Sequence, residues 1–386
     1  MKKVLICINN LDMGGIQKSL IELLKSISNL YEITLFCIKP GGILTNEIPE
    51  NINIIYGSDF ILASELSLYE AKQKNIKVYF TKIICTLFSK LFTKKIPAKI
   101  VTKFLQKNLG YYDVSISYSQ PVEEHKFFML TNEIVLYSCK SNLKLSWVHC
   151  DFEKYGGNTA YNKKMYQQFD RIVAVSDSVK EKFIGIVPEL KNKMYTVYNF
   201  HDYEKIIKKA QENPKIYKNF SVISIARMTE EKGLLRMLPI IKKIKEEKFD
   251  FSWHVVGDGP LRKNIEEMIN EYHLEEIVIL HGLQSNPYKY LLNSDLLLVP
   301  SYHEAAPMVF EEARVLNIPI LTTDTLSAKE LVGDKLIGIV CKNSDEDLEK
   351  SLREIISNYS HLKKVRQINN VTNDVQINQF RNAIGD

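Results

Sequence analysis

The sequence predicts an α/β protein with two Rossmann-like doubly wound domains that face each other across a cleft. Short apolar runs alternate with helix-like periods almost throughout the chain. Many of the runs are apolar on both faces, as parallel strands covered by helices are. The chain has thirteen such runs, about twice the number of strands in a typical sheet. A length of 386 residues also suits two domains.

The predicted strands fall into two groups. Those of the first half are residues 3–9, 32–39, 51–57, 113–119, 144–150, 171–176 and 195–200. Those of the second half are residues 221–227, 251–259, 277–282, 295–301, 319–324 and 337–342. Residues 199–219 are polar, contain one helical turn pattern and include Pro214, so the domain join is expected there. The expected domains are 1–198 and 199–370, and a helix within the C-terminal segment 371–386 is expected to return to the first domain.

Composition indicates a soluble globular protein, with 45% apolar and 25% charged residues and a net charge of +5. The apolar run at the N-terminus is too short for a signal peptide and is interpreted as a strand. No uncharged apolar run reaches transmembrane length. The six cysteines show no CxxC pair and no metal-like spacing, which predicts reduced, mostly buried thiols and a cytoplasmic protein.

One segment departs from this average. Residues 71–110 contain ten lysines and no Asp or Glu. Within it, apolar residues recur at helical spacing: Phe80, Ile83, Ile84, Leu87, Phe88 and Leu91. Such a helix could lie on an anionic membrane through Lys72–Lys107, or it could pack on its own sheet with a solvated lysine face. Nucleic acid is not expected as a partner, because the aromatic residues follow the apolar stripe and are not interleaved with the lysines.

Two turns have residues suited to phosphate. Gly14 and Gly15 stand between the first strand and a helical pattern, where backbone amides can approach an anion, although a tight turn alone explains them equally well. The pattern is neither GxGxxG nor a P-loop. Arg227 ends the first strand of the second domain and Lys232 follows five residues later. A guanidinium and an ammonium suit a diphosphate, but Arg227 could instead pair with a neighbouring glutamate.

Three glutamates lie in "SYHEAAPMVFEEAR", which follows a predicted strand. A helix is expected from Pro307 to Leu316, with Ala306 near its N-cap, so that its first amides lack a local side-chain partner. Glu312 falls on a partly apolar stripe, and a carboxylate on an apolar face needs a partner. Its side chain also leans back toward the start of the helix. Glu311 is expected at the surface, paired with Arg314 three residues later. Glu304 lies in the preceding loop and, with Glu312, suits hydroxyl donors of a sugar or ribose.

With these residues placed, the sequence resembles the retaining nucleotide-sugar glycosyltransferases of the GT-B fold that carry an E-x7-E motif. This large family contains bacterial polysaccharide, lipopolysaccharide and teichoic-acid transferases. The resemblance rests on five segments in the expected order: "GGIQKSL", "SIARMTEEKG", "VVGDGPLRKNIEEMI", "IVILHGLQSNPYKYLLNSDLLLVPS" with "EAAPMVFEEA", and "PILTTD". It covers most of the chain.

The resemblance implies a role for each residue singled out above. Arg227 and Lys232 would bind the donor diphosphate, to which Gly15 would also offer a backbone amide, with Gly14 as a binding residue of the same turn. The amides of Met308 and Val309 would face the sugar and phosphate. Further site residues would be Glu304 for the sugar hydroxyls, Glu312 for the ribose, Leu283 beside the base, and His149 for the primary hydroxyl of the sugar.

The implied reaction is transfer of a hexose or hexose derivative from a nucleotide-diphosphate sugar, with uridine as the expected base, to a saccharide acceptor in bacterial surface polysaccharide biosynthesis. The acceptor would bind the first domain and is expected to be lipid-linked. Neither a metal nor another cofactor is expected. Where the family has EGFG or EGFP this chain has "EAAP", which puts the identity of the sugar in question. A nucleotide-sugar 2-epimerase and a catalytically silent membrane-docked subunit are the two alternatives.

Overall fold

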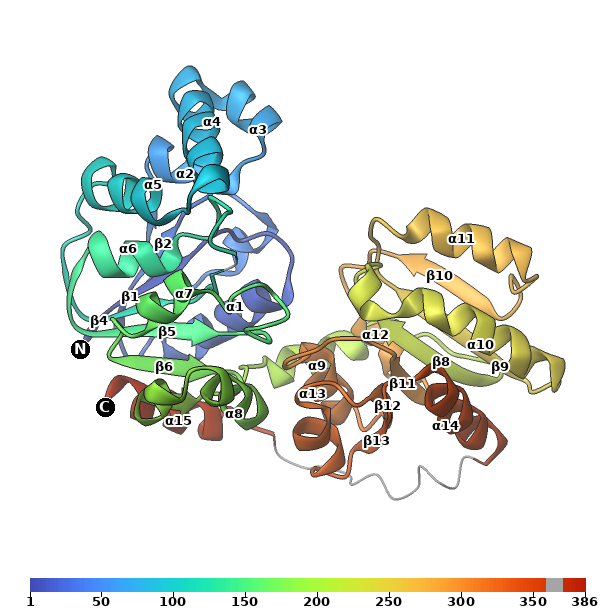
Figure 1. Cartoon of the computed structure of the whole chain (residues 1–386). Coiled ribbons are helices and arrows are strands. Elements are labelled where there is room, and N and C mark those ends of the chain that lie inside the picture. The colour runs from blue at the N-terminus through green and yellow to red at the C-terminus, as the bar shows by residue number, and fades with distance from the viewer. Residues whose placement is uncertain (122, 359–370) are drawn as a thin grey trace. The chain divides into compact units, whose positions relative to one another are not determined.

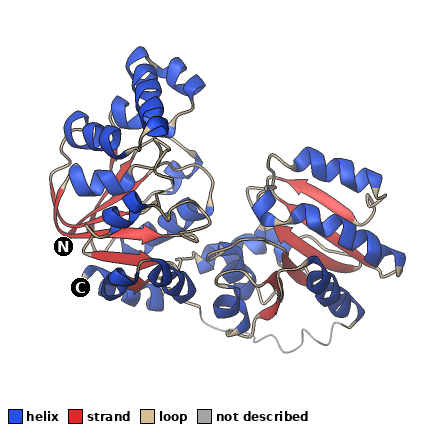
Figure 2. Cartoon of the chain, viewed as in Figure 1, coloured by secondary structure: helices blue, strands red, loops and turns tan. Residues whose placement is uncertain are grey.

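The computed structural model describes residues 1–121, 123–358 and 371–386. Its contacts divide the chain into two units, Met1–Phe200 with Asn373–Asp386, and His201–Thr372. Each unit contains one parallel sheet covered by helices (Figure 1, Figure 2). The division after Phe200 lies within residues 199–219, where the domain join was expected, and two residues after the domain bound of 198.

The first sheet has seven parallel strands in the order β3-β2-β1-β4-β5-β6-β7. They are β1 (Lys3–Ile8), β2 (Glu32–Cys37), β3 (Asn53–Tyr56), β4 (Tyr111–Ser117), β5 (Lys140–Val148), β6 (Arg171–Ala174) and β7 (Met194–Thr196). Each lies within or overlaps a predicted run, and the interior strand β1 is buried along five of its six residues. The sequence prediction of the first sheet is confirmed.

The second sheet has six parallel strands in the order β10-β9-β8-β11-β12-β13. They are β8 (Phe220–Ile225), β9 (Phe251–Val256), β10 (Val278–Gly282), β11 (Leu296–Val299), β12 (Ile320–Thr323) and β13 (Gly338–Cys341). These again match the predicted runs. All residues of β9 and β11 are buried, which explains why these strands read as continuous apolar segments. Two Rossmann-like sheets, as predicted, therefore make up the fold.

Helices connect the strands in both units. Those of the first unit are α1 (Gly15–Ile27), α2 (Asp59–Glu65), α3 (Leu68–Lys74), α4 (Ile76–Leu91), α5 (Lys95–Ile100), α6 (Thr131–Tyr137), α7 (Ala160–Tyr166), α8 (Asp177–Ile186) and α15 (Asp374–Ile384). Those of the second are α9 (Tyr203–Ala210), α10 (Leu234–Glu246), α11 (Arg262–Glu271), α12 (Tyr288–Leu291), α13 (Met308–Val315) and α14 (Asp345–Ser357). Short helical turns η1–η5 supplement them.

Helix α15 belongs to the first unit although it follows the second in sequence. The ring of Phe380 packs edge-on against Tyr31, with 5.9 Å between ring centroids. Arg171 Nη1 donates to the carbonyl oxygen of Asn382 at 2.8 Å. The C-terminal helix thus packs on the sheet that begins the chain, and Figure 1 shows both termini beside that sheet.

Five of the six cysteines are buried, Cys150 is half-buried, and all six are free thiols. Burial raises the pKa of the Cys37 thiol to about 12 and that of Cys85 to about 11. None of the helices within the described ranges combines the length and the hydropathy that crossing a bilayer requires.

Candidate active site

The ends of β8 and β11 bring together two residues that the sequence singled out separately. Lys232 lies in the turn η4 (Glu230–Lys232) after β8, and Glu304 lies in the loop after β11. Lys232 Nζ donates to Glu304 Oε1 at 2.5 Å, and Ser301 Oγ donates to the same oxygen at 2.9 Å. Both strands end at the carboxyl edge of the sheet, where open parallel sheets bind ligands.

Gly233 explains why the two turns approach so closely. Its φ is 65°, in the left-handed region, and a Cβ placed there would lie 2.0 Å from the carbonyl oxygen of Pro300. Only glycine fits this position without displacing the backbone at the end of β11. Lys232 thus provides an ammonium at this edge of the sheet, and Gly233 allows the close approach of the two turns that positions it.

Arg227 stands at the same edge, directly after β8. Its side chain is exposed and makes no hydrogen bond or ion pair with the described residues. The alternative that Arg227 pairs with a neighbouring glutamate is therefore wrong. Its backbone is fixed, because Thr229 N donates to the carbonyl oxygen of Arg227 at 2.9 Å. The backbone amide of the adjoining Met228 donates to the backbone carbonyl oxygen of Asp258 at 2.9 Å. A fixed backbone with an unoccupied guanidinium suits recognition of an anion.

Helix α13 begins at Met308, one residue later than predicted. Pro307 occupies the N-cap with an extended ψ of 128° and is not the first helical residue, so Ala306 lies outside the cap. No side chain caps the helix, as the sequence predicted. The amides of Met308 and Val309 donate to no other described residue. This helix start can accept an anion or hydroxyl ligand.

Glu312 lies on the second turn of α13 and is 4% exposed. Tyr288 Oη, from α12, donates to Glu312 Oε1 at 3.2 Å. The predicted buried orientation of Glu312 is therefore confirmed. Leu283 lies just after β10 and is 68% exposed. Its position follows from Gly282, whose positive φ of 68° ends the strand and whose carbonyl accepts the Gly257 amide at 2.9 Å.

Glu311 differs from its predicted place at the surface, because its side chain is only 13% exposed. The predicted pair with Arg314 is present, with Nε of Arg314 2.5 Å from Glu311 Oε2. Lys335 adds a second cation, 2.7 Å from Oε1. Burial alone would raise the pKa of Glu311, but the charges of Lys335 and Arg314 outweigh it and lower that pKa. Glu311 is thus a structural ion-pair residue.

In the first unit, Gly14 and Gly15 form the start of α1. Gly14 is the N-cap in an extended conformation that any residue can adopt, and no side chain caps the helix. A Cβ at Gly15 would meet no atom within 4 Å. Neither backbone strain nor packing therefore explains why position 15 is glycine. Close approach of a ligand to the backbone is an explanation that remains.

His149 follows β5 and is 9% exposed. Its Nε2 has no hydrogen-bond partner among the described residues, while its ring lies against Tyr118 with 4.7 Å between centroids. Burial lowers the pKa of His149 to about 3, although a hydrogen bond with the Tyr118 backbone opposes this. The imidazole is therefore neutral near pH 7, with one ring nitrogen able to bind a ligand hydroxyl.

Gln120 is a candidate that the sequence did not indicate. Its Oε1 accepts from the amides of His149 at 3.0 Å and Cys150 at 3.1 Å. Its Nε2 is buried and has no partner among the described residues. Because buried amide donors are nearly always satisfied, this one points to a missing acceptor beside His149. A glutamine after a strand has no sequence signal that distinguishes it from any other polar loop residue.

Of the candidate residues, the first unit contains His149, Gly14, Gly15 and Gln120. The second holds Arg227, Lys232, Leu283, Glu304, Met308, Val309 and Glu312. No group of three or more His, Cys, Asp or Glu side chains is placed to bind a metal ion in the part of the chain that the structure describes.

Comparison with known proteins connects this geometry to a family. Residues 205–372 match the family model described as glycosyl transferases group 1. An uncharacterised glycosyltransferase of Methanocaldococcus jannaschii is 32% identical over 168 residues, 42% of this chain and 41% of that protein. A Campylobacter jejuni enzyme, N-acetylgalactosamine-N,N'-diacetylbacillosaminyl-diphospho-undecaprenol 4-alpha-N-acetylgalactosaminyltransferase, is 29% identical over 184 residues, 47% of this chain and 49% of that protein. The chain spans about half the length of the curated relatives it matches.

Solved structures show the same fold at lower identity. Anabaena HepE in complex with UDP and glucose superposes with a TM-score of 0.65 at 15% identity, covering 94% of this chain and 92% of that one. Staphylococcus aureus TarM, in a complex that includes UDP, gives a TM-score of 0.68 at 12% identity, with 100% of both chains covered. The two parallel sheets are thus those of the GT-B fold.

Proposed function

We propose that this chain is a group 1 glycosyl transferase, the family whose model matches residues 205–372, and that it transfers a hexose or hexose derivative from a UDP-sugar to a saccharide hydroxyl with retention of configuration. The observation that carries the proposal is the edge of the second sheet, where Lys232 and Glu304 are in contact beside the exposed Arg227. Cations for a diphosphate and a carboxylate for sugar hydroxyls are what a nucleotide sugar requires.

In this proposal the positive groups act on the diphosphate. Arg227 binds it as a planar fork and Lys232 as a point charge, while the unsatisfied amides at the start of α13 contribute partial positive charge. Gly15 supplies a further amide from the first unit. These groups stabilise the charge that develops on the leaving UDP, which is where electrostatic catalysis has most effect.

The carboxylates and His149 position the sugar and ribose. Glu304 accepts hydrogen bonds from hydroxyls of the transferred sugar, and Lys232 holds it at the edge of the sheet. Glu312, oriented by Tyr288, accepts from the ribose. The neutral His149 and the free amide of Gln120 would bind the remaining hydroxyls of the sugar. Leu283 presents its backbone to the base.

Transfer then proceeds when the acceptor hydroxyl attacks the anomeric carbon from the same face as the departing UDP. The acceptor oxygen forms a bond to the anomeric carbon as the bond from that carbon to the β-phosphate oxygen breaks. The acceptor's proton passes to that same phosphate oxygen, and UDP leaves. This route retains configuration without a protein nucleophile, and no pair of carboxylates flanking the anomeric carbon is needed.

We propose a lipid-linked saccharide of bacterial surface polysaccharide biosynthesis as the acceptor, bound by the first unit. The name of the Campylobacter relative, which specifies a diphospho-undecaprenol acceptor, supports this class. HepE and TarM were each solved with UDP, which supports uridine as the base. The proposed location is the cytoplasm, at the inner face of the cell membrane.

The test is product analysis with a panel of UDP-sugars. Purified protein is incubated with each sugar nucleotide, with and without saccharide acceptors, and the products are resolved by chromatography and NMR. The proposal expects UDP release with one sugar, faster with acceptor, and a product with the donor's anomeric configuration. Conversion of the nucleotide sugar to its 2-epimer without UDP release would replace the proposal with an epimerase. No turnover and no UDP binding would leave a silent subunit.

A further inference from the structure

Helix α4 packs against the first unit with its less apolar side inward, where Val78 and Cys85 join the core and Lys82 and Ser89 lie beside them. Val78, Cys85 and Ser89 are buried, and Lys82 Nζ reaches back to the carbonyl oxygen of Ser64 at 3.4 Å. With about 100° of rotation per residue, these positions share one face of the helix. Burial lowers the pKa of Lys82, which fits an inward position. The most apolar face of α4, which a helix usually buries, is therefore not the face that contacts the protein.

The opposite face of α4 is apolar and exposed. It carries the outer stripe, which we define as Ile76, Phe80, Ile84, Leu87 and Leu91, exposed by 66%, 53%, 62%, 56% and 76%. At about 100° per residue the five positions fall within an arc of about 80°. Of the stripe predicted from the sequence, Phe80, Ile84, Leu87 and Leu91 are exposed, while Ile83 and Phe88 are half-buried at its margins. Exposure continues beyond α4 at Phe92, Ile96, Ile100, Phe104 and Leu105.

Lysines surround the outer stripe. Of the ten lysines in residues 71–110, only Lys82 and Lys94 point inward. The exposed ones are Lys72, Lys74, Lys77, Lys90, Lys95, Lys99, Lys103 and Lys107. Lys77 and Lys90 flank the stripe on its two sides, by the same helical geometry. No Asp or Glu occurs in this segment to neutralise them.

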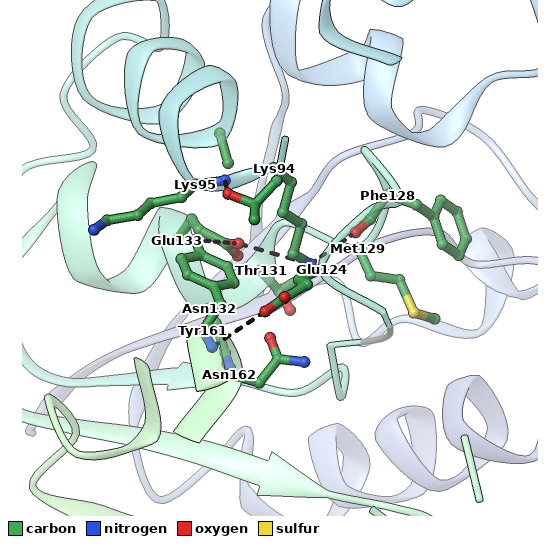
Figure 3. Close-up of polar contacts among 12 residues, drawn as sticks. Lys94, Lys95, Glu124, Phe128, Met129, Thr131, Asn132, Glu133, Tyr161 and Asn162 are labelled. Carbon is green, nitrogen blue, oxygen red and sulfur yellow. Dashed lines mark hydrogen bonds and ion pairs between the residues drawn. The ribbon is translucent and has the colours of Figure 1, made fainter. Parts of the chain in front are cut away.

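The buried Lys94 fixes this helical group to the body of the unit (Figure 3). Lys94 and Glu133 have fully buried side chains, with Lys94 Nζ 3.7 Å from Glu133 Oε1. Lys94 Nζ also donates to the Phe128 carbonyl oxygen at 3.3 Å, and Tyr161 Oη donates to Glu133 Oε1 at 3.1 Å. Because Lys94 is the N-cap of α5, this network ties the turn between α4 and α5 to α6 and α7. These contacts therefore hold the C-terminal end of α4, and with it the outer stripe, in place on the first unit.

We propose that the outer stripe and its exposed lysines form a docking surface for an anionic lipid bilayer. Apolar side chains would enter the boundary between headgroups and acyl chains, and the ammonium groups would remain among the anionic headgroups. The positive charge of this surface favours an anionic bilayer over a second copy of the chain as its partner. A second copy of the chain would bring eight more lysines against these eight, so self-association through this face is disfavoured. The proposal does not depend on the transfer reaction.

The test is flotation of the full chain with vesicles, without any sugar nucleotide. The vesicles are phosphatidylcholine alone, or equal parts phosphatidylcholine and phosphatidylglycerol. The protein is expected to float with the anionic vesicles at low salt, to be released as salt is raised, and to stay behind with phosphatidylcholine alone. Failure to float with anionic vesicles at low salt would overturn the proposal.

Two pairs of variants separate the contributions, and all alter exposed residues. Ile84→Gln with Leu87→Gln should lower the partition constant about tenfold or more. Lys95→Gln with Lys99→Gln should lower it about thirtyfold, from the usual contribution per lysine near a membrane. The matched control is Lys263→Gln with Lys342→Gln in the second unit, each 87% exposed, which should change nothing. Equal loss in the control pair, or a dimer that Ile84→Gln with Leu87→Gln dissociates, would contradict the bilayer as occupant.

Discussion

Lys232 Nζ and Glu304 Oε1 lie 2.5 Å apart, although 72 residues separate them in the chain. The contact joins the ends of β8 and β11, and Gly233 permits it by its close approach to Pro300. An ammonium that has three donors can hold a carboxylate and still contact a phosphate. The pair thus links the group proposed to bind sugar hydroxyls to one proposed to bind the diphosphate.

Replacing Glu304 tests the sugar contact. Glu304→Ala should reduce transfer by about a hundredfold to a thousandfold, the usual effect of removing one well-placed polar group from an active site. The protein should stay folded, with a modestly lower thermal unfolding midpoint, because Lys232 and Ser301 lose the acceptor that they share. Steady-state rates and circular dichroism measure the two effects.

The matched variant is Glu311→Ala, seven residues on. It would leave Lys335 and Arg314 without their carboxylate, so it should lower stability and spare the rate per folded molecule. If Glu304→Ala retained wild-type turnover, the assignment of the sugar site would be wrong.

Replacing Arg227 tests the diphosphate contact. Arg227→Ala removes an exposed guanidinium that has no partner among the described residues, so the free energy of unfolding should stay the same. UDP affinity should fall by about tenfold to a hundredfold, as expected for loss of a charge-assisted hydrogen bond. Calorimetric titration with UDP measures it, and Arg227→Lys should recover part of the loss. Unchanged UDP affinity in Arg227→Ala would remove this residue from the site.

Two glycine variants separate ligand binding from folding. Gly15→Ala meets no atom within 4 Å and should leave stability unchanged, while its methyl group obstructs a ligand that approaches the backbone. Gly233→Ala places a Cβ 2.0 Å from Pro300 O and should destabilise the second unit strongly. Thermal unfolding and UDP titration of both variants check this. A Gly15→Ala protein with unaltered donor binding and turnover would show that Gly15 serves the turn alone.

His149 predicts a pH dependence of stability. Its pKa is about 3 in the folded protein, because of burial, against an ordinary value of 6.5. Between these values the unfolded chain binds a proton that the folded chain does not, so the free energy of unfolding should fall as pH is lowered through this window. The slope of the free energy of unfolding against pH that His149 contributes approaches about 1.4 kcal/mol per pH unit within this window and vanishes above about pH 7.

Urea unfolding of wild type and His149→Asn at pH 5 and pH 7.5 tests this. The variant should lose less stability on acidification than the wild type. His254, whose pKa burial lowers to about 4, is present in both proteins and cancels from the comparison. An identical loss in both proteins would mean that His149 is not held neutral by burial.

Much of the fold could be predicted, because buried parallel strands have a direct signature in sequence. Strands such as β9 and β11 are covered on both faces and therefore read as continuous apolar runs. The uncapped start of α13 was also predictable, since the residues before it lack a capping side chain.

What could not be predicted depends on contacts between distant residues. Periodicity gives the width of the apolar stripe on α4 but not which face meets the protein, and here the less apolar face, with Val78, Cys85 and Ser89, does. Glu311 was expected at the surface because only its neighbour Arg314 was visible; Lys335, which helps to bury it, lies beyond a strand. Gln120 emerged only from the unsatisfied amide that the fold places beside His149.

The most direct test of the central claim is calorimetric titration of the purified chain with UDP, compared with Arg227→Ala. The account predicts one binding site, with affinity reduced in the variant and no need for an added metal ion. If the wild-type protein bound neither UDP nor any UDP-sugar, the assignment of Arg227, Lys232 and Glu304 to a nucleotide-sugar site would be contradicted.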